Sequence, residues 1–439
     1  MKSRRKFVKN TVVGSIGLTL ASTAKSYARI MGSNDRVNVA VMGTNSRGDA
    51  LTRVFIESDN VAVNFICDVD SKVLDKTVAM TGELQGSKPK GEKDIRKVLE
   101  SKDLDLLVIA APDHWHAPAT LMALQAGKHV YVEKPCGHNA REGELMIEAQ
   151  KKYGKVLQMG NQQRSGIFAI TALEDIKNGV IGEPYHARCW YANKRESIGH
   201  GKAAQVPDGL DYELWQGPAP REDYRDNIIH YHWHWFKTWG TGEICNNGTH
   251  ALDIARWLLE VDYPTKVTSA GGRYHVDDDW EFPDTQNTAF EFGDAKSISW
   301  ESVSRNGMPT YGQMTGTLIQ GTKGNMIVNT NGYRLFDESG EQIKELLSES
   351  ELDTADLVGI NKLTHHHAAN TLDAIRKGTS LTSPITEGHK SVLLCHLGNI
   401  SQQVGRTLHI DPLNGHILED PEAAALWGRE YADGWAPSV

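Results

Sequence analysis

Short apolar segments alternate with amphipathic stretches in the part of the chain that begins near residue 36. Strands are expected over 37–42, 61–67, 104–110 and 129–132, and helices over 49–58, 94–100 and 118–126. Continuous apolar strands separated by helices are typical of a parallel sheet with helices on both faces. The pattern predicts a doubly wound α/β domain over residues 34–158.

After Gly160 the segments become longer and alternate between apolar and polar positions. The expected strands are 185–191, 266–274, 288–292, 297–303, 315–320 and 325–330, and the expected helices are 170–178, 368–376 and 390–404. Alternation is typical of an antiparallel sheet with one covered face. We expect an α+β domain over 159–439, with a large open, mostly antiparallel sheet and C-terminal helices that pack back toward the first domain.

The first residues carry a pattern of their own. Arg4 and Arg5 lie in a basic segment, which is followed by an apolar stretch over 11–21 and small residues over 22–28. A basic disordered terminus would explain the charge but not this order of segments. The order predicts a twin-arginine signal and linker over 1–33, recognised by the twin-arginine export machinery, and hence a periplasmic or otherwise exported protein.

Composition narrows the possible partners. The 439 residues carry a net charge of −9, and Lys and Arg do not cluster in any stretch as they do in proteins that bind the phosphates of nucleic acids. Nucleic acid is therefore not an expected partner. Beyond the first thirty residues no apolar run approaches the ~20 residues of a membrane span. The five cysteines include no C-x-x-C pair, which argues against a zinc knuckle or a disulfide framework.

A glycine-containing turn, Gly43-Thr44-Asn45-Ser46-Arg47-Gly48, joins the first strand to its helix. It stands where G-x-G-x-x-G binds a pyrophosphate at a helix N-terminus, although Asn45 replaces the middle glycine and a structural turn is an equal alternative. Asp68 ends the second strand about twenty residues further on, where a carboxylate binds the adenosine ribose. It favours NAD over NADP, although Lys72 nearby keeps NADP open.

Two further motifs follow strands of the same sheet. The sequence 111–116, Ala-Pro-Asp-His-Trp-His, follows the third strand, and Glu133-Lys134-Pro135 follows the fourth. Ligands of open parallel sheets bind beyond the carboxyl ends of the strands. We therefore expect both motifs to face one crevice.

The order of these motifs resembles the Gfo/Idh/MocA family, named after glucose-fructose oxidoreductase, inositol dehydrogenase and rhizopine catabolism. The similarity continues through Gly248–Trp257 and the C-terminal helices, and covers nearly all of the mature chain. It implies a Rossmann-type NAD-binding domain, an α+β substrate domain and a homo-oligomer, a dimer or a tetramer. The cofactor residues would be Gly43, Asn45, Ser46, Arg47, Gly48, Asp68, Ala111, Pro112, His116, Glu133, Lys134 and Gln162.

The resemblance also implies catalytic roles. Lys134 would lie beside the nicotinamide and hydrogen-bond the reacting hydroxyl, and His250 would accept the hydroxyl proton. Many relatives carry an aspartate at the position of Asn246. A neutral amide cannot raise the basicity of His250. Glu243 or a residue of the histidine-tryptophan run at 230–236 could then replace the missing aspartate.

Residues 230–236 read His-Tyr-His-Trp-His-Trp-Phe. As a strand, this run would place three histidines on one face and aromatic rings on the other, and aromatic rings suit the apolar faces of sugars. A metal site ranks below sugar binding because no acidic or cysteine ligand is near in sequence, and a structural loop remains an alternative. The predicted substrate residues are Lys134, Arg164, His232, Trp233, His234, Trp235, Asn246 and His250, while Lys194 and Arg195 could contact substrate or solvent.

These observations favour an exported oxidoreductase that transfers a hydride between NAD(P) and a hydroxyl carbon of a sugar, glycoside or polyol. Because free NAD is scarce outside the cytoplasm, we expect a tightly held cofactor. One alternative is an NAD-assisted glycoside hydrolase that works by oxidation, elimination and re-reduction. The other alternative is a non-catalytic secreted sugar-binding protein. Asn246 is the only residue that favours this hypothesis.

Overall fold

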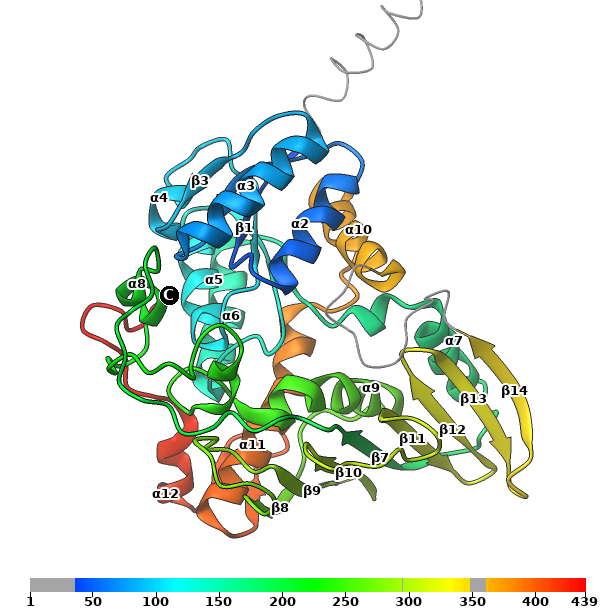
Figure 1. Ribbon diagram of the computed structural model, residues 1–439. Coiled ribbons are helices and arrows are strands. Elements are labelled where there is room, and N and C mark those ends of the chain that lie inside the picture. Colours follow the sequence, from blue (N-terminus) through cyan, green and yellow to red (C-terminus); the bar gives the residue numbers. More distant parts are fainter. Residues whose placement is uncertain (1–35, 294, 348–360) are drawn as a thin grey trace, which may run out of the picture.

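The structure of the protein is a computed structural model that describes residues 36–293, 295–347 and 361–439. Figure 1 shows an N-terminal α/β unit next to a broad sheet that carries helices on one side. The predicted export signal over 1–33 lies outside the described residues and stays a prediction.

The N-terminal unit contains a six-stranded parallel sheet of the order β3-β2-β1-β4-β5-β6. Its strands are β1 (Val37–Met42), β2 (Val61–Cys67), β3 (Lys90–Glu92), β4 (Leu106–Ile109), β5 (His129–Val132) and β6 (Leu157–Met159). The helices are α2 (Arg47–Glu57), α3 (Ser71–Gln85), α4 (Ile95–Leu99), α5 (Asp113–Gln125) and α6 (Ala140–Tyr153). Strand β4 is buried throughout, as expected for a sheet covered on both faces. The doubly wound prediction is confirmed.

Helix α5 begins earlier than its sequence predicts. The sequence predicts this helix only over 118–126. In the structure Pro118 lies within the helix, which starts directly after Pro112. Asp113 and His116 therefore lie in the first turn of a helix that begins at the carboxyl edge of the sheet.

The second domain carries a ten-stranded sheet of the order β14-β13-β12-β11-β7-β10-β9-β8-β15-β16. The strands are β7 (Pro184–Ala192), β8 (Lys266–Gly272), β9 (Thr285–Phe292), β10 (Lys296–Val303), β11 (Thr315–Gly321), β12 (Gly324–Asn329), β13 (Gly332–Asp337), β14 (Gln342–Leu347), β15 (Leu408–Ile410) and β16 (Ile417–Leu418). The pairing of β7 with β10 is parallel and the other pairings are antiparallel. Alternating burial along β9 shows that one face is covered.

Helices α7 (Ile167–Lys177), α9 (Thr249–Leu259) and α11 (Ile385–Val404) cover that face, and their apolar side chains form one core with the sheet. Helix α10 (Lys362–Lys377) contacts α2, and α11 contacts α6 of the first domain. The short elements are η2 (Gln162–Ser165), α8 (Tyr212–Gln216), η3 (His232–Trp235), η4 (Ile244–Gly248), α12 (Pro421–Ala424) and η5 (Ala425–Trp427). In the described ranges, none of the helices combines the length and apolar character needed to cross a bilayer.

The histidine-tryptophan run does not form the strand considered from its sequence. Residues His232–Trp235 form a 3-10 helix, η3, so successive side chains do not alternate between two faces. The physical reason is a local aromatic core: the ring of Trp235 stacks on Trp280 with centroids 3.8 Å apart, and Trp239 is fully buried beside them. Packing of large rings outweighs the period-two pattern here.

Candidate active site

One cleft between the two domains, with a cavity volume of about 340 Å³, brings together most of the residues predicted from sequence. Its lining includes Gly43, Asn45, Ser46, Arg47, Asp68, Ala111, Pro112, His116, Glu133, Lys134, Gln162, Trp233, His234, Asn246 and His250. Gly48, Arg164, His232 and Trp235 do not line it. The cleft thus joins the carboxyl edge of the parallel sheet to the start of α9.

The glycine turn makes a close backbone approach at the start of α2. Gly43 has a φ of +78°, and a Cβ on it would lie 2.6 Å from the backbone of Ala111. A Cβ on Gly48 would lie 1.8 Å from the carbonyl oxygen of Gly43, so only a glycine at position 48 lets the helix pack this closely against the turn. The Ser46 side chain makes no capping hydrogen bond, which leaves the helix N-terminus open toward the cleft.

Asp68 is held at the end of β2 by the turn itself. Its carboxylate accepts hydrogen bonds from the Thr44 backbone N–H at 2.7 Å and from the Asp70 backbone N–H at 3.0 Å. Burial raises the pKa of Asp68, while these hydrogen bonds act in the opposite direction. The carboxylate is therefore fixed at the edge of the cleft, in the position expected for a ribose ligand.

Glu133 is part of a buried polar cluster beneath the cleft. Arg47 Nε donates to Glu133 Oε1 at 2.8 Å, and Gln162 Nε2 donates to the same oxygen at 2.9 Å. Burial alone would raise the pKa of Glu133, but Arg47 and Lys134 outweigh it and the pKa lies below its ordinary value. Arg47 and Gln162 thus both bond the ionised carboxylate of Glu133 at the floor of the cleft.

Lys134 joins the two domains. Its Nζ donates to the backbone carbonyl of Asn246 at 2.7 Å and to Asn246 Oδ1 at 3.2 Å. Asn246 lies in η4, a π-helical turn that leads directly into α9. Burial lowers the pKa of Lys134, with Glu133 and Asp113 opposing the shift. The amide at 246 therefore orients the lysine through neutral oxygens and does not act on the basicity of His250.

His250 occupies the first turn of α9 and faces the same cleft. His250 is buried, with only 6% of the residue exposed. Even so, neither nitrogen of its ring has a hydrogen-bond partner among the described residues. Burial, together with the positive charges of Lys134 and Arg47, places the pKa of His250 well below its ordinary value. The ring is thus neutral and able to accept a proton.

Glu243, considered as a partner for His250, has another role. It forms an ion pair with Arg195, in which Arg195 Nε lies 2.7 Å from Glu243 Oε2, and it accepts a hydrogen bond from Ser304. Arg195 lines the cleft and lies over the ring of Trp235. Glu243 thus fixes a cleft arginine rather than the predicted base.

An aromatic pair forms one wall of the cleft. The rings of Trp233 and His234 stack with centroids 3.6 Å apart. Burial lowers the pKa of His234 to about 3, so its imidazole is neutral. Over the described part of the chain, no group of three or more His, Cys, Asp or Glu side chains is placed to hold a metal ion. His232 instead contacts the backbone carbonyl of Asn227, outside the cleft.

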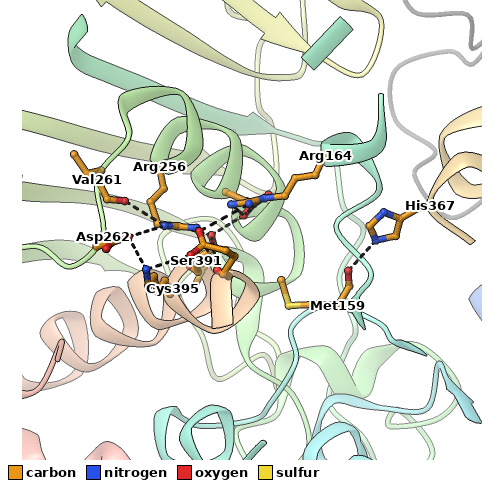
Figure 2. A network of polar contacts seen from close by, with 11 residues as sticks. Met159, Arg164, Arg256, Val261, Asp262, His367, Ser391 and Cys395 are labelled. Atoms are coloured by element: carbon orange, nitrogen blue, oxygen red, sulfur yellow. Dashed lines mark hydrogen bonds and ion pairs between the residues drawn. The ribbon is translucent and has the colours of Figure 1, made fainter. Parts of the chain in front are cut away.

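Arg164, expected to contact substrate, points into the protein interior. Figure 2 shows it among the polar side chains of α9 and α11. It forms three hydrogen bonds of 2.8–3.0 Å to Asp253, and Ser391 Oγ also donates to Asp253. Arg164 and Asp253 are 3% and 2% exposed, respectively. The buried carboxylate of Asp253 explains why Arg164 turns away from the cleft.

Comparison with known proteins decides the family. Residues 37–161 match the model of the Gfo/Idh/MocA oxidoreductase family with its NAD-binding Rossmann fold, and residues 177–326 match the model of that family's C-terminal α/β domain. The chain belongs to the Gfo/Idh/MocA family. The first domain of the chain is the one that matches the family's NAD-binding Rossmann fold.

Curated relatives of this Gfo/Idh/MocA protein carry a different description. A glycosyl hydrolase family 109 protein from Shewanella pealeana is 25% identical over 211 residues, which is 44% of this chain and 46% of the relative. The protein of the same description from Shewanella woodyi is 27% identical over 162 residues, or 36% and 35% of the two chains. The chain spans half or less of the length of these relatives.

Solved structures share the fold along most of the chain. A levoglucosan dehydrogenase in complex with NADH and levoglucosan superposes with a TM-score of 0.64 at 18% identity, covering 85% of this chain and 99% of the other. The aldose-aldose oxidoreductase from Caulobacter crescentus, in complex with glycerol, gives 0.65 at 16% identity and covers 85% and 100%. GenD2 from gentamicin A biosynthesis, in complex with NAD, gives 0.64 at 19% and covers 86% and 97%.

Several cleft residues of this family member were not predicted as ligands. Asp113 lines the cleft and accepts a hydrogen bond from the Thr241 hydroxyl at 2.5 Å. Its place within the motif at 111–116 is the sequence signal that could have identified it. Leu210, Leu214 and Trp215 also line the cleft. These three carry no sequence signal, because neither Leu210 nor the short helix α8, which holds Leu214 and Trp215, belongs to a motif or a repeating pattern.

Proposed function

We propose that the protein transfers a hydride between NAD and a hydroxyl carbon of a sugar, glycoside or polyol. One observation carries the proposal: Lys134 of the first domain meets Asn246 of the second, with Nζ 2.7 Å from the carbonyl oxygen, and His250 lines the same cleft. A cation and a neutral imidazole are thus placed together at the carboxyl edge of the sheet, where substrates of such folds meet the cofactor.

The cleft has features that suit NAD. The positive φ of Gly43 and the open N-terminus of α2 present backbone donors for a pyrophosphate. Asp68 presents a carboxylate for the adenosine ribose, which disfavours the additional phosphate of NADP. When bound, NAD supplies the acceptor for the hydride that leaves the substrate carbon.

The chain's own side chains then handle the substrate oxygen. The neutral ring of His250 accepts the hydroxyl proton, because a carbon releases hydride only as its oxygen loses that proton. The ammonium of Lys134, turned into the cleft by Asn246, stabilises the negative charge on that oxygen. Trp233 and His234 offer a flat apolar surface that suits a sugar ring.

The test is to incubate purified protein with NAD and a panel of glycosides and polyols, recording both the nicotinamide absorbance and any released aglycone. The proposal predicts reduction of the nicotinamide without aglycone release. His250→Asn, which keeps a polar group of similar size, is the matched control and should lose the signal. Absence of any redox change across the panel would contradict the proposal.

A second candidate is an NAD-assisted glycoside hydrolase. It is favoured by the curated relatives, which are described as glycosyl hydrolase family 109 proteins. The same cleft would serve, because Lys134 and His250 act on a sugar hydroxyl in either reaction. In the panel above, aglycone release without net nicotinamide reduction selects this candidate.

Export by the twin-arginine route and homo-oligomer formation complete the proposal. Export is supported by the order of basic, apolar and small residues over 1–28, and a tightly held NAD follows from the scarcity of free NAD outside the cytoplasm. Replacing Arg4 and Arg5 by lysine should retain the protein in the cytoplasm, as cell fractionation can check. Light scattering of the purified protein should give the mass of a dimer or a tetramer.

A further inference from the structure

Residues 209–215 of the second domain, here termed the strap, reach across to the first domain beside Asp68. The carbonyl oxygen of Gly209 accepts hydrogen bonds from the Ser71 N–H at 3.0 Å, from Ser71 Oγ at 3.1 Å and from Lys93 Nζ at 2.8 Å. The next residue of the strap, Leu210, pairs with Asp70 in an antiparallel bridge. The strap is thus bonded to residues 70 and 71, which follow Asp68 closely in the chain.

The other end of the strap is fixed on α5. The carbonyl oxygen of Trp215 accepts a hydrogen bond from Trp115 Nε1 at 3.0 Å and one from His114 Nε2 at 2.9 Å. His114 and Trp115 belong to the motif at 111–116, yet His114 does not line the cleft. Its role in the structure is to anchor the strap, which therefore spans two points of the NAD-binding domain.

Between its anchors the strap turns apolar side chains toward the cleft. Leu210 and Leu214 line the cavity together with Val69 and Ile95 of the first domain. Val69 and Leu210 pack with one apolar cluster, so this wall joins both domains. Such an apolar wall suits the flat base of an adenosine. Asp68, the carboxylate expected to bind the ribose, lines the same cleft.

We propose that the strap completes an adenosine site built from both domains, so that NAD can leave only when residues 209–215 separate from Val69–Ser71. The proposal rests on the proposed use of NAD and adds a cause for its retention. At one end the strap is held by the three hydrogen bonds to Gly209 and by a fourth from the Asp211 N–H to the Val69 carbonyl oxygen at 3.0 Å, and at the other end by the two to Trp215. These bonds make strap opening the slow step of cofactor exchange.

The first test measures the rate at which the holoprotein releases isotope-labelled NAD into an excess of unlabelled NAD. The double variant Leu210→Ala/Leu214→Ala removes the apolar wall and leaves the backbone bonds of the strap in place. Its release rate should rise about tenfold or more, because the packing of Leu210 and Val69 on one apolar cluster and the contact of both leucines with the ligand also hold the strap closed. Leu84→Ala, at a 51% exposed leucine of α3, is the matched control and should release NAD at the wild-type rate.

The second test locks the strap. A Cβ on Gly209 would lie 3.4 Å from Ser71 Cβ, close to the ~3.5–4.5 Å between the Cβ atoms of a disulfide. Ser71→Cys/Gly209→Cys, loaded with NAD and then oxidised, should release NAD at least tenfold more slowly than the same protein after reduction. The single variant Gly209→Cys controls for the strain of a side chain at a φ of +93°.

The outcomes separate this proposal from the proposed function. Release rates that stay equal in the leucine variant and in the wild-type protein, while NAD still binds, overturn the strap proposal alone. A wild-type protein that binds no NAD overturns both. Faster release in the leucine variant together with slower release in the oxidised double-cysteine variant supports the strap as the barrier to exchange.

Discussion

The ion pair between Arg164 and Asp253 allows a direct test of whether Arg164 is structural or a substrate ligand. Three hydrogen bonds of 2.8–3.0 Å join the two side chains, and both are almost fully buried. Arg164→Met would leave the Asp253 carboxylate buried with Ser391 as its remaining hydrogen-bond donor. Because an unpaired buried charge is costly, we expect the free energy of unfolding to fall by about 3–5 kcal/mol.

The assay is urea unfolding followed by tryptophan fluorescence, with saturating NAD in every sample. Lys377→Met removes one cation from an exposed ion pair with Asp373, and should cost about 0–1 kcal/mol. Adding Asp253→Asn to Arg164→Met should recover part of the loss, because it removes the unpaired charge. A loss below about 1 kcal/mol for Arg164→Met, accompanied by a tenfold rise in KM, would show that Arg164 is a substrate ligand and not a structural residue.

Three further predictions concern the cleft. Lys134→Met should lower kcat/KM by about 10²–10³, since it removes a charge aimed at the substrate oxygen; an unchanged rate in steady-state kinetics would contradict that role. Because the pKa of His250 lies well below 6.5, kcat/KM of the wild-type protein should persist as the pH falls through 6.5 and should drop only when the pH reaches the lowered pKa. A pH–rate profile with its acid limb at or above 6.5 would argue against His250 as the base. Asp68→Ala should raise the Kd for NAD and narrow the preference over NADP in equilibrium titrations, whereas equal affinities before and after the change would exclude the ribose contact.

Contiguous patterns gave reliable predictions for this chain. The doubly wound domain and the mostly antiparallel sheet follow from runs of apolar residues whose periodicity is local. The expectation that the motifs at 111–116 and 133–135 face one crevice also rests on local sequence, because each directly follows a parallel strand, and residues of both line the cleft. Local sequence carries this information since the carboxyl ends of parallel strands share one edge.

Features that depend on distant partners could not be predicted. Nothing near Arg164 indicates that Asp253, 89 residues further along the chain, takes its guanidinium away from the cleft. The run at 230–236 has two possible periodicities, and the buried ring of Trp280 decides between them only in three dimensions. The strap at 209–215 has no repeating pattern, so its role becomes visible only through its bonds to Ser71 and Trp115.

Hydride transfer between a substrate carbon and NAD can be followed directly by isotope transfer from a glycoside that reduces the nicotinamide in the panel. That glycoside is prepared with deuterium on its ring carbons and mixed with the NAD-loaded protein. After denaturation, the mass of the released cofactor is measured by mass spectrometry. We expect one deuterium on the nicotinamide in the wild-type protein and almost none in the same time with His250→Asn. Reduced nicotinamide that carries no deuterium would contradict hydride transfer between a substrate carbon and NAD in this cleft.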